Sequence, residues 1–305
     1  MPPRQCVTGL THACLHAGFL CNTDSCGVRM LWKCKYALEA CKDLVDEMQK
    51  RTPNGPLVKQ KMDQTFALRR KEVVESEPAI STMVRRWPAL FTEDQVFMEF
   101  SRIVGKNLKT EFYESIDRHS PRLLELFGSK RGNVGQLLTH ILQQTNTTEP
   151  TAIRTQVLRG LPIILGDNPT DFFKAGFESD DDDSFRDPDI GILLIEREGA
   201  VLTSSQHLSP ASLEIIIEGE VVMDNIQDLP KAMCILFGLM YALHLNYPKT
   251  MKLTFQFIQQ GAPMRDDKTA GLHPFGGYEP NCFLSFKLFH KKPHQELIQN
   301  DEGQK

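Results

Sequence analysis

The apolar positions of this chain follow a helical spacing up to residue 177 and a strand-like spacing after residue 190. The first stripe predicts a helix over residues 33–50, because its members recur every three to four positions. They are Cys34, Ala37, Leu38, Cys41, Leu44, Val45 and Met48. A run of turn-forming residues at 52–56, Thr-Pro-Asn-Gly-Pro, ends this helix.

Four further helices are indicated by their first residues. Thr92 and Gln95 form a capping box ahead of an apolar stripe, and Pro121 is expected to open a short helix of its own. Asn133 and Pro150 precede two more apolar stripes. The chain up to residue 177 is therefore predicted to be helical.

The pattern beyond that point predicts a small antiparallel sheet. Short runs rich in β-branched residues lie at 190–195, 213–217 and 221–223, separated by turn residues. Two apolar or amphipathic segments, 229–245 and 249–260, are expected to be helices that cover this sheet. The predicted fold class is α+β, with a helix-rich N-terminal region followed by a small antiparallel sheet packed with two helices.

The boundary between these regions is marked by charge. Residues 178–189 are rich in Asp and Glu and almost free of apolar residues, which is typical of an exposed linker. Ser179 and Ser184 flank its acidic run and are candidate phosphorylation sites. The predicted organisation is a poorly ordered, cysteine-rich leader at 1–30, a helical domain at 31–177, the acidic linker at 178–189, an α+β unit at 190–260 and a polar, largely irregular tail at 261–305.

The expected location is intracellular, in the cytoplasm or the nucleus. The longest apolar stretch without a charged residue, 232–248, is shorter than the roughly 20 residues that span a bilayer. Residues 1–30 contain no clean secretory signal. The net charge is −4, so binding to nucleic acid would have to be local. We expect no membrane span and no cofactor.

Cysteine is concentrated at the N-terminus, where six of the eight lie within the first 41 residues. They could form a zinc site with His12 or His16, or they could be small apolar residues of a helix. Structural zinc usually needs ligands two to four residues apart, and only Cys21 and Cys26 approach that spacing. The sequence therefore favours free thiols and no metal.

Signatures of the main enzyme families are missing from the sequence, including the P-loop, dinucleotide-binding, zinc-protease and C-x-x-C patterns. The nearest match is a metal-dependent nuclease pattern with Asp189 and Glu196, in which Glu198 replaces the required lysine. A divergent metal-dependent hydrolase is thus the third hypothesis. Cys234 is expected to be inert packing in an apolar helix, and His119 and His244 to lie in a turn and at a helix end.

Two basic clusters are candidate nucleic-acid contacts, because arginines can hold phosphates while an aromatic ring stacks on a base. The cluster residues are Arg69, Arg70, Lys71, Arg85, Arg86 and Trp87. Residues 50–131 carry 16 Lys and Arg against 11 Asp and Glu, which makes this region locally positive. The competing interpretation is an ordinary helix surface whose basic groups face water.

Several blocks of the sequence, including 62–70, 112–126, 219–223 and 232–249, resemble one known family. Over residues 57–260 the chain is similar to the sterile alpha motif domain-containing protein 3-like proteins, a multi-copy family of fish proteins. The family-motif core is Leu236, Phe237, Gly238, Leu239, Tyr241, Tyr247 and Pro248. The sequence contains no sterile alpha motif, and the resemblance implies no enzymatic activity.

The patterns together favour a non-enzymatic protein that acts as an interaction or scaffold protein, with protein partners. The alternative is a nucleic-acid-associated protein that uses the basic helical surface. The two hypotheses differ in whether the basic clusters are accessible to a phosphate backbone.

Overall fold

The computed structural model describes residues 25–143, 148–177, 189–196 and 210–260, with side chains from residue 36 to residue 259. Helices occupy most of the first half and strands appear only from residue 173 onwards, which confirms the α+β class. The predicted leader, acidic linker and tail lie largely outside the described residues, and both candidate phosphorylation sites, Ser179 and Ser184, lie outside them entirely.

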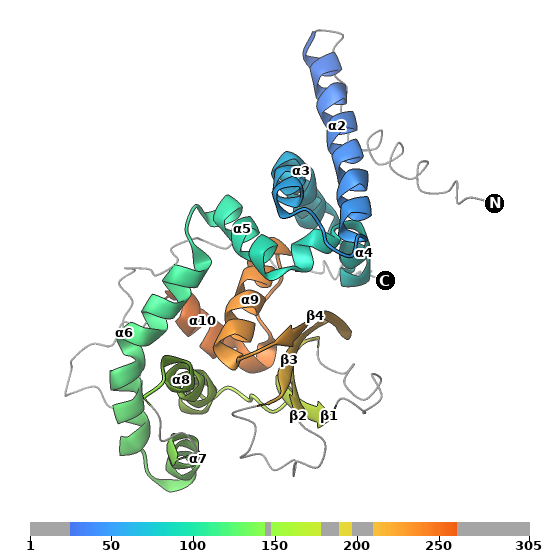
Figure 1. Cartoon of the computed structure of the whole chain (residues 1–305). Coiled ribbons are helices and arrows are strands. Elements are labelled where there is room, and N and C mark those ends of the chain that lie inside the picture. Colours follow the sequence, from blue (N-terminus) through green and yellow to red (C-terminus); the bar gives the residue numbers. More distant parts are fainter. Residues whose placement is uncertain (1–24, 144–147, 178–188, 197–209, 261–305) are drawn as a thin grey trace, which may run out of the picture.

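The helices of the first half follow one another with short connections (Figure 1). They are α2 (Ser25–Met48), α3 (Gly55–Ser76), α4 (Ile80–Arg86), the 3-10 turn η1 (Pro88–Phe91), α5 (Glu93–Val104), α6 (Leu108–Ser129), α7 (Gly132–Gln143) and α8 (Pro150–Leu165). The predicted break at 52–56 is confirmed, because Asn54 caps α3 by accepting a hydrogen bond from Leu57 N at 3.2 Å. The first helix begins at Ser25, earlier than its apolar stripe predicts.

The capping box predicted for α5 is wrong, although the helix itself is present. Thr92 precedes the helix, but its hydroxyl donates to the carbonyl oxygen of Ala89 at 2.8 Å and does not cap α5. The 3-10 turn η1 places that carbonyl within reach, and a serine or threonine hydroxyl readily bonds to a nearby backbone acceptor.

The short helix predicted to start at Pro121 is also wrong, because Pro121 lies inside α6. This helix starts at Leu108, where Asn107 accepts a hydrogen bond from Thr110 N at 3.1 Å. A proline in a helix removes one backbone hydrogen bond, here the bond to the carbonyl of Asp117. That residue is exposed, so water can satisfy the carbonyl, while buried residues on both sides of the proline hold the helix in place.

The sheet has four strands in the order β1 (Phe173–Phe177), β2 (Ile190–Glu196), β3 (Ser212–Ile217) and β4 (Glu220–Ile226). The β2–β3 and β3–β4 pairs are antiparallel, as expected. β1 pairs in parallel with β2, so the sheet is mixed and β1 joins it from a segment assigned by sequence to the helical domain. The β3–β4 turn places Glu218 and Gly219 at φ 53° and 73°, which matches the twist of a tight two-residue hairpin.

Helix α9 (Leu229–Ala242) is the centre of the molecule. Twelve of its residues are buried, which confirms the buried helix predicted from the uncharged stretch at 232–248. It packs against α5, α6 and α8 and also against β3 and β4, whereas α10 (Lys252–Gln260), which follows the turn η3 (Lys249–Met251), packs mainly against α8. Among the described helices, none combines the length and apolar character needed to cross a membrane.

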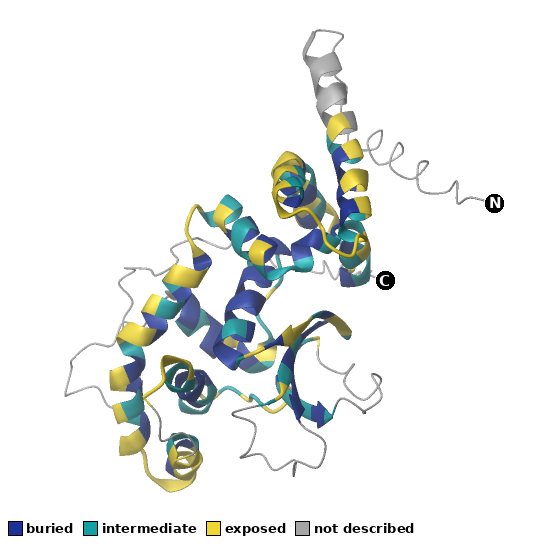
Figure 2. Cartoon of the chain, in the orientation of Figure 1, coloured by how far each residue is buried: buried dark blue, intermediate teal, exposed yellow. Residues whose placement is uncertain are grey.

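The buried apolar residues form one large cluster that runs from Cys41 to Ile258 (Figure 2). The cluster includes residues from both sides of the predicted acidic linker, so the segments 31–177 and 190–260 share a core. Their common element is α9, whose side chains contact helices on one side and strands on the other. A smaller cluster of Leu193, Ile195 and Ile216 lies apart from this core.

Candidate functional site

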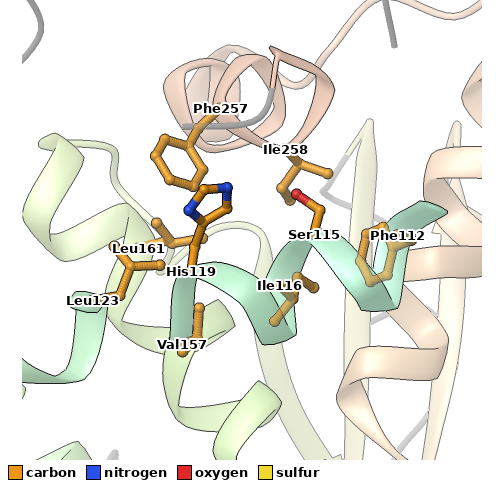
Figure 3. Close-up of a pocket in the computed structure, with 9 residues that line it drawn as sticks. All are labelled: Phe112, Ser115, Ile116, His119, Leu123, Val157, Leu161, Phe257 and Ile258. Carbon is orange, nitrogen blue, oxygen red and sulfur yellow. The ribbon is translucent and has the colours of Figure 1, made fainter. Parts of the chain in front are cut away.

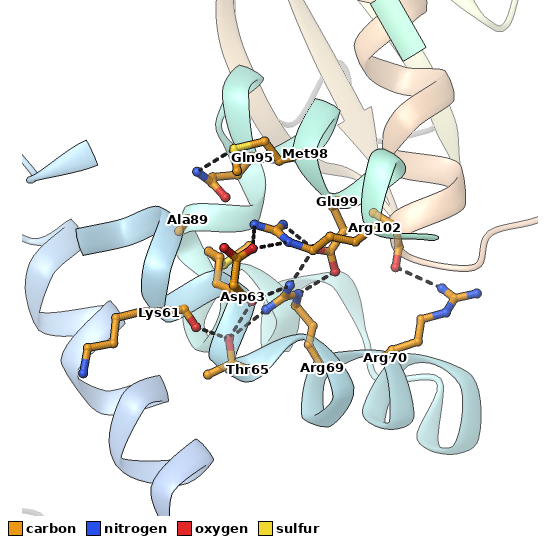
Figure 4. A network of polar contacts seen from close by, with 12 residues as sticks. Lys61, Asp63, Thr65, Arg69, Arg70, Ala89, Gln95, Met98, Glu99 and Arg102 are labelled. Carbon is orange, nitrogen blue, oxygen red and sulfur yellow. Dashed lines mark hydrogen bonds and ion pairs between the residues drawn. The ribbon is translucent and has the colours of Figure 1, made fainter. Parts of the chain in front are cut away.

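The first predicted nucleic-acid contact, Arg69, is buried inside the helical region (Figure 4). Its guanidinium donates from Nε and Nη2 to the two carboxylate oxygens of Glu99, at 2.7 and 2.5 Å. It also donates to Thr65 Oγ1 at 3.0 Å, and both side chains of the ion pair are only 1% exposed. This bidentate pair fixes α3 against α5 and leaves no donor surface for a phosphate.

Trp87, the predicted stacking residue, is fully buried. Its indole nitrogen donates to Glu72 Oε2 at 3.2 Å, and Arg69 lies over its ring at 5.3 Å from the centroid. Arg86 pairs with the same carboxylate oxygen of Glu72 at 2.9 Å and also lies beside the ring. These contacts join α3 to the end of α4, so the ring cannot stack on a base.

Arg70, on α3, caps the C-terminal end of α9. Its Nη1 donates to the carbonyl oxygens of Tyr241 and Ala242, at 3.0 and 3.5 Å, which are among the carbonyls that a helix end leaves without partners. Burial lowers the pKa of Arg70. The predicted helix-end role of His244 is therefore carried by Arg70, while His244 adopts a positive φ of 56° just after the helix.

Two members of the basic clusters, Lys71 and Arg85, are exposed, while Arg70 and Arg86 are partly buried. The Nζ atom of Lys71 lies 3.8 Å from Oε2 of Glu75, one turn along α3. Arg85 is exposed, and its Nε donates to the carbonyl oxygen of Ser81 at 3.2 Å. The six residues therefore do not form one exposed surface. The burial of Arg69 and Trp87 removes the groups that were expected to hold a phosphate and a base.

The predicted metal pair is separated by a whole strand. Asp189 precedes β2 and Glu196 ends it, and a strand of this length spans about 20 Å. One cation needs its ligands within about 2–2.6 Å, so these two carboxylates cannot share an ion. Glu196 instead lies close enough to Arg159 to act on its pKa, which burial lowers to about 10. Among the residues that the structure describes, no cluster of three metal-ligating side chains occurs.

The cysteines with described side chains, Cys41 and Cys234, are buried free thiols. Burial raises the pKa of both, which favours the unreactive thiol form. This result agrees with the packing role predicted for Cys234, and Cys41 lies on the predicted apolar stripe of α2. Cys34 and Cys26 lie in the part of α2 whose side chains are not described, and the other cysteines with His12 and His16 lie outside the described residues.

A small apolar pocket lies between α6, α8 and α10 (Figure 3). Its volume is about 10 Å³, which is at the lower limit for a single water molecule. His119 projects into it towards Phe257, beside Leu123 and Leu161. The prediction that His119 lies in a turn is wrong, because it occupies the middle of α6 next to the tolerated Pro121.

Acidification is expected to weaken the fold through His119. Burial, and to a smaller extent Arg118, lowers the pKa of His119 below 6.5. The unfolded chain then takes up the proton first, so the free energy of unfolding falls as the pH drops from about 6.5 towards the lowered native pKa. Urea titrations of the wild type and His119→Gln at pH 7.5 and 5.5 measure how far the free energy of unfolding falls in each protein.

Between pH 7.5 and pH 5.5 the free energy of unfolding is expected to fall less in the variant than in the wild type. His244, whose pKa is lowered in the same direction, supplies a matched His244→Gln control for the remaining dependence. Equal pH dependence of wild type and His119→Gln would contradict a partly buried His119 whose pKa is lowered in the folded chain.

The family-motif residues lie on α9 and in the segment that follows it. Phe237 lies within an aromatic group, with ring centroids 5.3 Å from Tyr241 and 6.5 Å from both Tyr247 and Phe255. Gly238 allows α5 and α6 to approach, because a Cβ there would lie 2.6 Å from a methyl group of Val96. Leu236 and Leu239 are fully buried, and Pro248 precedes η3. These residues are structural and are not accessible to a partner as a set.

Helix α7 presents the exposed apolar surface that the sequence reasoning missed. Val134 and Leu137 are 41% and 57% exposed, and Ile141 is partly exposed one turn further on. The opposite side of the helix is buried through Gly135 and Leu138, which face α6 and α8. A recognisable signal was present: α7 has apolar residues at five positions of residues 134–142, more than its one buried face requires. We name Val134, Leu137 and Ile141 the α7 surface.

The fold and its surfaces define an α+β protein in which N-terminal helices and a mixed sheet share one buried helix. Residues 38–92, from the middle of α2 to the end of η1, match the family described as "Sterile alpha motif domain-containing protein 3, helical domain". This match supports, over these residues, the resemblance to the sterile alpha motif domain-containing protein 3-like proteins that the sequence indicates. A comparison with curated proteins gave no match, and a comparison with solved structures gave none either.

Proposed function

We propose that this chain is a non-enzymatic protein-interaction module that binds a protein partner through the α7 surface. The observation that carries the proposal is the exposure of two large apolar side chains, Val134 and Leu137, one turn apart on the same helix. Exposed apolar residues that occur singly are ordinary, whereas contiguous apolar patches mark interaction sites.

The fold supports this role because α6 and α8 pack against one face of α7 and hold it in place. Its buried face packs against α6 and α8, and a Cβ on Gly135 would lie only 2.5 Å from the carbonyl oxygen of Lys130. The helix therefore starts in a tight turn that only glycine permits. In Figure 1, α7 and the projecting α2 lie at opposite ends of the molecule.

The experiment is affinity capture of the tagged full chain from cells, with half of each sample treated with nuclease. The double variant Val134→Ser/Leu137→Ser is expected to recover its partners several-fold less well than the wild type, with or without nuclease. The matched control is Val74→Ser/Leu253→Ser, which removes two similarly exposed apolar side chains from α3 and α10.

Two results would contradict the proposal. Equal recovery by the α7 variant and the control would show that partners bind elsewhere. Loss of the partners on nuclease treatment would show that nucleic acid holds them, which would favour the alternative function despite the burial of Arg69 and Trp87.

A further inference from the structure

We propose that the partner of the α7 surface is an acidic amphipathic helix, whose apolar side chains pack on Val134, Leu137 and Ile141 while its carboxylates face Lys130 and Arg131. This inference rests on the proposed function and adds the chemistry of the partner. It is carried by the shape of the surface and by the sign of the charge around it.

The shape of the α7 surface suits a helix. Val134, Leu137 and Ile141 follow the spacing i, i+3, i+7, so their side chains lie along one side of α7 over two turns, or about 10 Å. A helix that crosses or runs along such a stripe inserts apolar residues with the same spacing, which is a common mode of helix recognition. The exposure of Leu137 makes it the central contact.

The charges of the segment that carries the α7 surface have one sign. From residue 129 to residue 143 the chain has no Asp or Glu, while Lys130 and Arg131 lie exposed just before α7. The first turn of α7 contains no acidic residue either, so the partial positive charge of the helix N-terminus adds to the two side-chain charges. A partner with carboxylates beside its apolar anchors complements this end, whereas a basic partner is repelled.

A second copy of the chain fits the surface less well. Two twelve-residue helices in contact bury much less than the roughly 1,200–2,000 Å² of a stable interface. The segment 129–143 of a second copy also brings no carboxylate to pair with Lys130 and Arg131. The acidic helix is therefore the occupant that the charge of this segment favours.

The test uses a synthetic amphipathic peptide of about 20 residues, long enough to form a helix, with Leu on one face and Glu on the other. Fluorescence anisotropy of the labelled peptide measures its binding to the full chain. The expected result is binding that weakens about tenfold or more in Val134→Ser/Leu137→Ser and in Lys130→Glu/Arg131→Glu, and that is unchanged in Val74→Ser/Leu253→Ser.

A matched peptide with Lys in place of every Glu is expected not to bind. The inference would be overturned if the two peptides bound equally well. It would also be overturned if none of these substitutions changed the affinity of the acidic peptide. Sedimentation data that show self-association of the wild type and its loss in the α7 variant would overturn it as well, because the occupant would then be a second copy.

The peptide test and the capture test fail separately. If captured partners still depend on Val134 and Leu137 but the acidic peptide does not bind, the interaction surface stands and the proposed partner chemistry is wrong. If capture does not depend on these residues, the proposed function itself fails, whatever the peptide does.

Discussion

Replacement of Glu99 by Ala is expected to lower the free energy of unfolding by about 3–5 kcal/mol, because it leaves the charge of Arg69 buried without its partner. Glu99 accepts two hydrogen bonds from Arg69 and one from Arg102 Nη1 at 2.8 Å. Without the carboxylate, the Arg69 guanidinium retains only the Thr65 hydroxyl and the Met62 carbonyl oxygen. Urea unfolding of the wild type and the variant measures the loss.

Two further variants test the physical reason for this effect. The double variant Arg69→Met/Glu99→Leu removes both charges and keeps an apolar filling, so it is expected to be less destabilised than Glu99→Ala. Lys71→Ala removes an exposed charge from the same helix and is expected to change the free energy of unfolding by less than about 0.5 kcal/mol. A Glu99→Ala effect as small as that of Lys71→Ala would contradict a buried, charged pair.

Replacement of Phe237 by Ala is expected to cost about 3–5 kcal/mol of unfolding free energy, because it opens a cavity at the centre of the shared core. Phe237 is fully buried and lies among the rings of Phe112 from α6, Tyr241 from α9 and Phe255 from α10. The contact therefore joins helices from both halves of the chain. Phe237→Leu keeps part of the side-chain volume, so its free energy of unfolding is expected to fall less than that of Phe237→Ala.

The form of the Phe237→Ala transition is as informative as its size. Because α9 packs against elements of both halves, urea is expected to unfold the variant in one step. Circular dichroism and tryptophan fluorescence follow this transition, and the fluorescence reports on the helical half through Trp87. A first step that spares the tryptophan signal would show two separate cores, as the predicted division into segments 31–177 and 190–260 implied.

Local sequence signals determined most of the secondary structure. Asn54 and Pro56 mark the start of α3, and the uncharged stretch at 232–248 marks a helix that is buried on every side. The short runs rich in β-branched residues after residue 190 mark three strands of the sheet. These features were predictable because they depend on nearest neighbours along the chain, on caps and on the period of apolar residues.

The misassigned elements depend on distant parts of the chain. Pro121 is tolerated in α6 because the helix packs on α8, which no local rule for proline includes. β1 is a five-residue strand that exists only because β2 lies beside it, so its own sequence indicates little. Thr92 has the right spacing for a capping box, but the turn η1 offers its hydroxyl a nearer acceptor.

The candidate site shows the same division between local and distant information. Arg69 continues the buried stripe of Val58, Met62, Thr65 and Val73 along α3, and this spacing is a signal that it faces inwards. The adjacent pair Arg69-Arg70 is predicted to be a surface because arginines can hold phosphates and residues 50–131 are locally positive. On a helix, neighbouring residues point about 100° apart, so each arginine meets different partners.

The sequence by itself determined that this chain forms helices first and strands later, that one helix is fully buried, and that it resembles the sterile alpha motif domain-containing protein 3-like family. Only the tertiary structure decided which charges are structural and which apolar residues stay exposed. The physical reason is that burial depends on what packs against a side chain. Arg69 is covered because α5 brings Glu99 to it, and Leu137 is exposed because none of the described elements covers that side of α7.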